Sequence, residues 1–342
     1  MRPVMGAVLA IAVLVGAGCT SSGTPSHDPG RVVMPVKRVA VPGRLYLTKS
    51  RTLYRFAGTR LTALLRGTTV KDPAVSPDGS RLAFVELQAQ SSTIVLSDVL
   101  GQKRRTITPA AAAEGALWAF APAFSADGGH IAYLTDRGKQ RSSPQNLQPN
   151  DLGIWMEDTA GGQPRSLVAP VAYTGGDSDP TFRPGVGDEL LYTSYLYGGV
   201  PLQPEARLSW LSVRTGARAY LSPDQARNFE PAISPDGRFV AFIHGSPAGD
   251  DLEVMPLEPS YRGDPRPYPT EAAVVLQTGM VSQPVWAPDG SAIAFLKLMN
   301  GSFDLFILPV SAGGGQLRAT SAAEEVSHGS FLDADSRLAW SP

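Results

Sequence analysis

The chain has 342 residues, enough for one large domain or two ordinary ones with a sizeable core. Its 30 Lys and Arg residues nearly balance its 31 Asp and Glu residues, so no global field would draw it to nucleic acid, and no nucleotide-binding fingerprint is present. Abundant Gly and Pro, 35 and 30 residues spread along the chain, are typical of many short strands joined by turns.

Residues 1–19 have the pattern of an export signal. Arg2 supplies a positive end, and the apolar run from Val4 to Val15 is too short to span a bilayer as a helix. Small residues then precede Cys19, which resembles the lipobox of bacterial lipoproteins, although Gly16 stands where that family favours leucine. The resemblance implies cleavage before Cys19, a lipid on its thiol, and anchoring at the extracytoplasmic face of the cell membrane or outer membrane. The alternative is an ordinary cleaved signal that leaves Cys19 free.

The segment that follows predicts a tether. Residues 20–42 are rich in Ser, Gly, Pro and Thr and show no apolar periodicity, so we expect a disordered leash. Cys19 is the only cysteine of the chain, so the domain after the leash must be stable without disulfides.

Six segments about fifty residues apart share one pattern, a spacing typical of propeller blades. In most of them a polar residue and Pro lead into a short apolar strand, a turn and a second strand. Three copies keep Pro-Asp-Gly in the turn, where Pro fixes φ and Gly accepts a positive φ. The segments begin at Asp72, Ala121, Asp179, Glu230, Gln283 and His328.

Two further strands follow most of these segments, and four antiparallel strands make a propeller blade. The last repeat ends after two strands, whereas three strand-like stretches (44–48, 52–56 and 60–65) precede the first repeat. We therefore predict an all-β, six-bladed β-propeller over residues 43–342. Its sixth blade is shared, with inner strands from the C-terminus and outer strands from the N-terminus, and which early stretches join it stays open.

The repeats resemble those of TolB and the wider WD40-like propeller group, whose signature is a Pro-x-Trp/Phe-Ser-Pro-Asp-Gly string followed by an apolar strand. The resemblance covers the chain from about residue 43 onward. It implies the fold, but this propeller serves many functions. TolB has an α/β domain before its propeller, and here only a signal and a leash are expected, which argues against a TolB role in the Tol–Pal system.

The residue that opens each inner strand is the first candidate for a binding site. Matching residues of all blades should meet at one mouth of the central channel, so we expect a polar ring there, formed by Asp72, Asp179, Glu230, Gln283 and His328. The same face should carry the longest loops, 137–151 and 196–206. Aromatic candidates for this face are Trp118, Phe120, Tyr173, Tyr197 and Phe229.

These features favour a non-catalytic binding or scaffolding module of the cell envelope, with a protein, peptide or glycan as partner. The alternative is an extracytoplasmic propeller enzyme, a carbohydrate-active lyase or hydrolase type, with His328, Glu230 and Asp179 as acid and base. No catalytic motif or metal-ligand string is present, and we expect no cofactor. Two alternatives stay open for the carboxylates of the ring: they hold a cation, or they are solvated residues of a wet channel.

Overall fold

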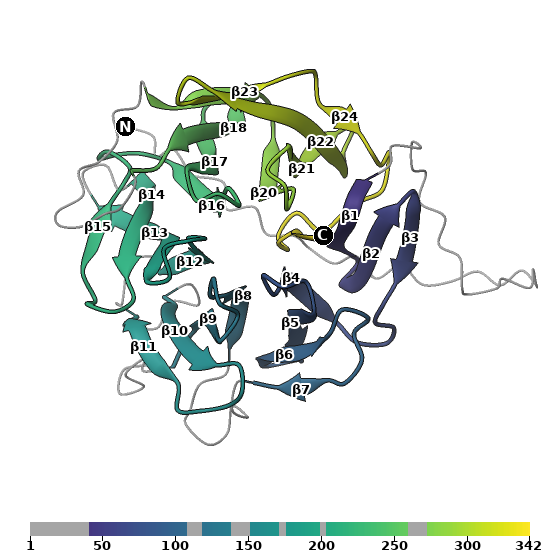
Figure 1. The fold of residues 1–342 in the computed structure, drawn as a ribbon, viewed down its shortest axis with the longest axis vertical. Helices are drawn as coiled ribbons and strands as arrows, with labels where there is room; N and C mark the ends of the chain where they lie inside the picture. The colour runs from purple at the N-terminus through teal and green to yellow at the C-terminus, as the bar shows by residue number, and fades with distance from the viewer. Residues whose placement is uncertain (1–40, 108–117, 138–150, 171–175, 199–202, 259–271) are drawn as a thin grey trace, which may run out of the picture. The chain divides into compact units, whose positions relative to one another are not determined.

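The computed structural model describes residues 41–107, 118–137, 151–170, 176–198, 203–258 and 272–342. Over these ranges the chain forms six antiparallel sheets around a common centre, as Figure 1 shows. The predicted all-β, six-bladed propeller is therefore confirmed. Cys19, with the expected signal and almost all of the leash, lies outside the described residues.

The first five blades follow one another along the chain. Blade 1 contains β4 (Val70–Val75), β5 (Arg81–Leu87), β6 (Ser92–Asp98) and β7 (Arg105–Thr106). Blade 2 contains β8 (Ala119–Phe124), β9 (His130–Thr135), β10 (Gly153–Asp158) and β11 (Arg165–Val168). Blade 3 contains β12 (Asp177–Phe182), β13 (Glu189–Gly198), β14 (Gln203–Ser212) and β15 (Arg218–Tyr220). Blade 4 contains β16 (Asn228–Ile233), β17 (Phe239–Ser246), β18 (Gly249–Pro256) and β19 (Val274–Gln277). Blade 5 contains β20 (Val281–Trp286), β21 (Ala292–Met299), β22 (Ser302–Gly313) and β23 (Gln316–Ala319), and β24 (Glu324–Glu325) also pairs with β22.

Blade 6 joins the two ends of the propeller. Its order is β25 (Ala339–Ser341), β1 (Val41–Lys49), β2 (Thr52–Gly58) and β3 (Arg60–Ala63). The shared blade is thus confirmed, but it takes one strand from the C-terminal side instead of the expected two. All three early stretches join it. The pairing of Leu45 with Trp340 closes the ring and leaves β1 no free edge on that side.

The Ser-Pro-Asp-Gly turns fold through their own side chains. Ser76 Oγ donates to Asp78 Oδ1 at 2.5 Å and accepts from the Arg81 amide at 2.9 Å, while Gly79 has a φ of 67°. Ser234 makes the same contacts in blade 4. Each turn therefore positions the second strand from local chemistry alone.

The core lies between neighbouring blades because both faces of each sheet are covered. In β5, Leu82 and Phe84 are buried against blade 6, and Ala83 and Val85 are buried against blade 2. This alternation is the period of a strand with two buried faces.

The propeller has two faces that are used below. The loop face carries the connections between second and third strands, such as the β1–β2 turn at Ser50 and Arg51. The proline-turn face carries the connections between first and second strands, such as Pro77 and Asp78.

Much of the expected 196–206 loop is instead strand, because β13 runs to Gly198 and β14 starts at Gln203. Residues 138–150 of the other expected loop lie outside the described residues. No helix in the described part of the chain is long and apolar enough to cross a membrane.

Candidate binding site at the loop face

Five of the six predicted ring residues occupy equivalent positions and share an unusual backbone. Each has a positive φ and directly precedes a proline. The values are 52° for Asp72, 46° for Ala121, 52° for Asp179, 54° for Glu230 and 55° for Gln283. Each also lies within a register shift between its inner strand and the second strand. Such bulges reorient side chains, and these five residues line one cavity of about 310 Å³. Neither the bulge nor the left-handed backbone was predicted from the sequence.

The sixth member of the ring is Arg337 and not His328, which corrects the predicted alignment. Pro342 lines the cavity on the proline-turn side, as turn prolines of other blades such as Pro288 do. The C-terminal Trp340-Ser-Pro therefore aligns with Trp286-Ala-Pro of blade 5. Arg337 then matches Gln283, and it lines the same cavity as the other five ring residues. The His328 side chain is 70% exposed and pairs through Nδ1 with Glu325 Oε1 at 2.7 Å. His328 therefore does not line the cavity with Glu230 and Asp179, the two residues with which it was predicted to act as acid and base.

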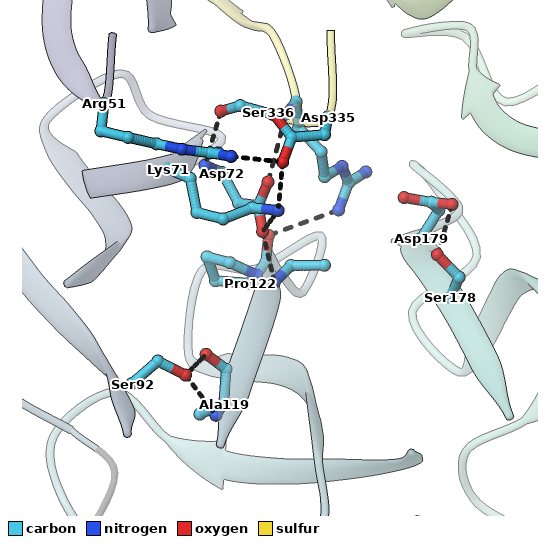
Figure 2. A network of polar contacts seen from close by, with 12 residues as sticks. Arg51, Lys71, Asp72, Ser92, Ala119, Pro122, Ser178, Asp179, Asp335 and Ser336 are labelled. Carbon is cyan, nitrogen blue, oxygen red and sulfur yellow. Dashed lines mark hydrogen bonds and ion pairs between the residues drawn. The ribbon is translucent and has the colours of Figure 1, made fainter. Parts of the chain in front are cut away.

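Asp72 connects three blades. Its carboxylate accepts the backbone amide of Arg337 at 3.2 Å and that of Ala121 at 3.2 Å. Its own amide donates to Ser336 Oγ at 2.9 Å (Figure 2). Burial raises the pKa of Asp72, while Lys71 and these two amides oppose the rise. These contacts assign Asp72 a structural role at the point where the ring closes.

Glu230 plays a similar role between blades 4 and 5. It accepts the Gln283 amide at 2.5 Å and the Gln283 side-chain amide at 2.9 Å. Ser282 Oγ also donates to it, at 3.3 Å. Burial in the channel raises the pKa of Glu230, and the neighbouring charge of Asp179 raises it further. Gln283 is thus held by Glu230 and contributes to the wall.

Two carboxylates of blade 3 have far fewer partners. Asp179 is only 9% exposed and accepts one hydrogen bond, from Ser178 Oγ to Oδ2 at 2.6 Å. Asp177 accepts Ser194 Oγ at 3.0 Å, and burial raises its pKa to about 7. Asp177 also lines the cavity. The sequence analysis missed it because it lies two residues before the repeat position.

The cationic side chains at the channel mouth already have partners within the protein. Lys71 Nζ lies 3.8 Å from Asp72 and 3.7 Å from Asp335, and Arg51 contacts the same Asp335 oxygen at 2.6 Å (Figure 2). Arg337 Nη1 donates to the carbonyl of Pro180 at 3.0 Å. This network was not predicted, because it joins the first blade to the last.

A second cavity, of about 410 Å³, opens on the proline-turn side. It shares four lining residues with the first cavity, namely Asp179, Glu230, Gln283 and Arg337. These four residues form the waist of the channel. The Arg337 guanidinium, which reaches a carbonyl of blade 3, crosses this waist.

The five aromatic residues predicted for the loop face lie in different places in the structure. Trp118 and Phe120 stack with ring centroids 5.9 Å apart, and Phe120 lines the cavity, where Lys71 Nζ lies 5.6 Å from its ring. Phe229 packs instead against the core between blades 4 and 5. Tyr173 and the side chain of Tyr197 lie outside the described residues. The face is therefore partly aromatic, at Trp118 and Phe120.

Three exposed apolar side chains lie elsewhere on the loop face, on segments joined by backbone hydrogen bonds, and were missed by the sequence analysis. Met280, Met299 and Phe331 account for three of the six exposed large hydrophobic residues of the described chain, and Phe331 is 63% exposed. The Leu298 amide, next to Met299, donates to the Met280 carbonyl. The Phe331 amide donates to Ser302 Oγ, and Ser302 pairs with Met299 across the β21–β22 hairpin. We call these three residues the apolar patch.

The described residues contain no group of three His, Cys, Asp or Glu side chains arranged to hold a metal ion. The carboxylates of the ring are each bound to a neighbouring blade or separated along the wall of the cavity.

No protein-family model matches the chain. Among curated proteins, the uncharacterized peptidase YuxL of Bacillus subtilis is 24% identical over 214 residues, which cover 54% of this chain and 30% of that protein. The Tol-Pal system protein TolB of Hydrogenovibrio crunogenus is 27% identical over 97 residues, covering 28% of this chain and 20% of that protein. The matched region thus spans less than a third of each of these relatives.

Solved structures give a broader match. TolB from Acinetobacter baumannii superposes with a TM-score of 0.62 at 17% identity, covering 88% of this chain and 67% of that one. A putative TolB from Agrobacterium tumefaciens gives 0.53 at 15% identity, covering 88% and 98%. A puromycin-hydrolyzing peptidase of Mycobacterium tuberculosis gives 0.54 at 15% identity, covering 86% of this chain and 47% of that one. The fold is a TolB-like six-bladed β-propeller, and at these identities the likeness shows the fold alone.

Proposed function

We propose that this protein is a lipid-anchored extracytoplasmic propeller that binds a protein partner through its loop face and catalyses no reaction. The observation that carries this function is the apolar patch, which lies on the same face as a cavity lined by charged residues. A relative in the Tol-Pal system supports a protein partner and a place outside the cytoplasm.

The apolar patch has the properties of a contact site. Exposed clusters of large apolar side chains mark interaction surfaces, and aromatic residues often supply most of the binding energy. Phe331 has a φ of 50°, a costly conformation for a bulky residue. Its amide is held by Ser302 Oγ at 2.8 Å, and the preceding Ser330 amide by Asp304 at 2.8 Å. The Phe331 ring is thus held exposed before any partner arrives.

The described chain enters the propeller at the proline-turn face, where Gly43 of β1 lies against Ser341. The proposed anchor is a lipid on Cys19, joined to this end of the propeller by the expected leash. Mass spectrometry of the mature protein tests the anchor. We expect a lipid-modified N-terminal cysteine and a Cys19→Ser variant that leaves the membrane fraction, whereas an unmodified Cys19 would contradict the anchor.

The binding function is tested by crosslinked capture from native membranes. A triple variant with Met280, Met299 and Phe331 changed to Ser should lose a partner that the native protein captures. A matched control replaces exposed apolar residues elsewhere, Leu100 and Val275, by Ser. Equal capture by the native protein and the triple variant would contradict loop-face binding.

An enzyme remains the second candidate, because the pKa of Asp177 and that of Glu230 are raised inside a cavity and a peptidase is among the structural neighbours. It is tested by turnover of peptide and oligosaccharide panels. Turnover that Glu230→Gln abolishes would establish catalysis, and we expect none.

A further inference from the structure

We infer that the loop-side cavity binds a cationic group of the partner, a guanidinium or primary ammonium, between Asp177 and Asp179 of blade 3. This inference rests on the proposed function and deepens it, because it names the chemistry that reaches the channel mouth. It starts from the charges that line the cavity: five carboxylates, at Asp72, Asp177, Asp179, Glu230 and Asp335, against two cations, at Lys71 and Arg337.

Three of these carboxylates are compensated by the protein. Asp72 accepts two backbone amides and lies beside Lys71, and Asp335 contacts Arg51 and Lys71. Glu230 accepts both amides of Gln283. These three carboxyl groups therefore have their partners within the fold.

Asp177 and Asp179 are not compensated in this way. Each accepts a single serine hydroxyl, and within the described part of the chain no cationic side chain lies within 4.0 Å of either carboxylate. Asp179 is nine-tenths buried, lines both cavities, and its Oδ1 has no donor among the described residues. Figure 2 shows Asp179 with only its Ser178 contact, apart from the network around Lys71 and Asp72.

A buried carboxylate without a counter-charge is costly, and a ligand cation that pairs with it removes the cost. Two carboxylates on one strand can share the planar fork of a guanidinium, which binds in a bidentate manner. Phe120 of the neighbouring blade 2 also lines the cavity, and aromatic faces attract cations. The cavity therefore provides charge, burial and an aromatic wall for one cationic side chain.

The test uses the full-length protein in detergent and the probe Nα-acetyl-arginine amide, with Nα-acetyl-citrulline amide as its neutral isostere. Binding is followed by saturation-transfer NMR at low salt. We expect the arginine probe to bind at least tenfold more tightly than the citrulline probe, and the Asp177→Asn/Asp179→Asn variant to lose this preference. Asp188→Asn, which removes one carboxylate from the same blade outside this cavity, should keep it.

Folding of the double variant is checked by thermal unfolding, where removal of uncompensated carboxylates should leave the melting temperature unchanged or raised. Equal binding of both probes to the native protein, or an unchanged preference in the folded double variant, would overturn the inference. If partner capture depends on the apolar patch while the arginine probe does not bind, this inference fails and the proposed function stands. If the probe binds as expected and no partner is captured, the cation-binding site stands and the proposed function fails.

Discussion

Asp72 Oδ1 accepts the backbone amide of Arg337, 265 positions later in the chain, at 3.2 Å. The bond joins the first inner strand to a residue two positions before the closing strand β25. Ring closure therefore depends on a side chain at the channel as well as on the strand pairing within blade 6.

Asp72→Ala should destabilise the propeller by about 2–4 kcal/mol, because it leaves the buried amides of Ala121 and Arg337 without an acceptor. Asp179→Ala removes a carboxylate that accepts only a serine hydroxyl, so we expect a change within about 1 kcal/mol. Urea unfolding followed by circular dichroism compares the two. Equal losses would refute the distinction between structural and uncompensated carboxylates.

Substitution of Gly43 tests how much the pairing of β1 with the closing strand β25 contributes to stability. Its φ is 71°, and a Cβ there would lie 2.2 Å from the Ser341 carbonyl oxygen of β25. Gly58 has a φ of 58° with nothing within 4 Å. Gly58→Ala should therefore cost only the left-handed strain, about 1–2 kcal/mol. Gly43→Ala adds displacement of the closing strand, and we expect at least about 3 kcal/mol. Similar melting temperatures for both variants would show that β25 is not needed for stability.

A buried ion pair lies within blade 3, and its arginine also reaches a carbonyl of blade 4. Arg183 Nη1 lies 2.8 Å from Glu189 Oε2, both side chains are 3% exposed, and Arg183 Nε donates to the Gly237 carbonyl at 2.9 Å. Arg183→Met alone should cost about 3–5 kcal/mol, because the buried Glu189 carboxylate would lose its guanidinium partner. The double variant Arg183→Met/Glu189→Leu should recover most of this loss. A double-mutant cycle by chemical denaturation measures it, and additive losses would contradict the coupling.

The Asp177 carboxyl should make stability depend on pH. Its pKa is about 7 in the folded protein, mainly because of burial, against about 4 in the unfolded chain. Between these values the folded state binds more protons, so stability falls as the pH rises through this window. Each pKa unit corresponds to about 1.4 kcal/mol, which gives a total on the order of 2–4 kcal/mol. Asp177→Asn should reduce this slope between pH 4 and 7, and unfolding curves across that range check it. An identical slope would show that the carboxyl is not desolvated.

The blades and their turns could be predicted because their chemistry is local. Ser76, Pro77, Asp78 and Gly79 specify the turn by themselves, and similar strings recur along the chain. The ring position was also predictable wherever a proline marks the inner strand.

The sixth blade was aligned incorrectly for a physical reason. Its inner strand has Leu338 where the other blades have proline, and Arg337-Leu-Ala-Trp looks like the second strand of blade 1, Arg81-Leu-Ala-Phe. Strand pairing with Leu45, far away in the sequence, decides its place. The apolar patch was missed for the same reason, since Met280 and Phe331 meet only through the hairpin that contains Ser302.

The most direct test of the central claim is site-specific photocrosslinking in native membranes, with benzoylphenylalanine placed at Phe331 on the loop face or at Tyr220 on the outer strand of blade 3. Both native side chains are exposed aromatics, so the reporter is tolerated equally at the two positions. We predict one discrete protein adduct from position 331, lost on Met299→Ser, and none from position 220. Adducts from position 220 alone, or the same adducts from both positions, would contradict binding through the loop face.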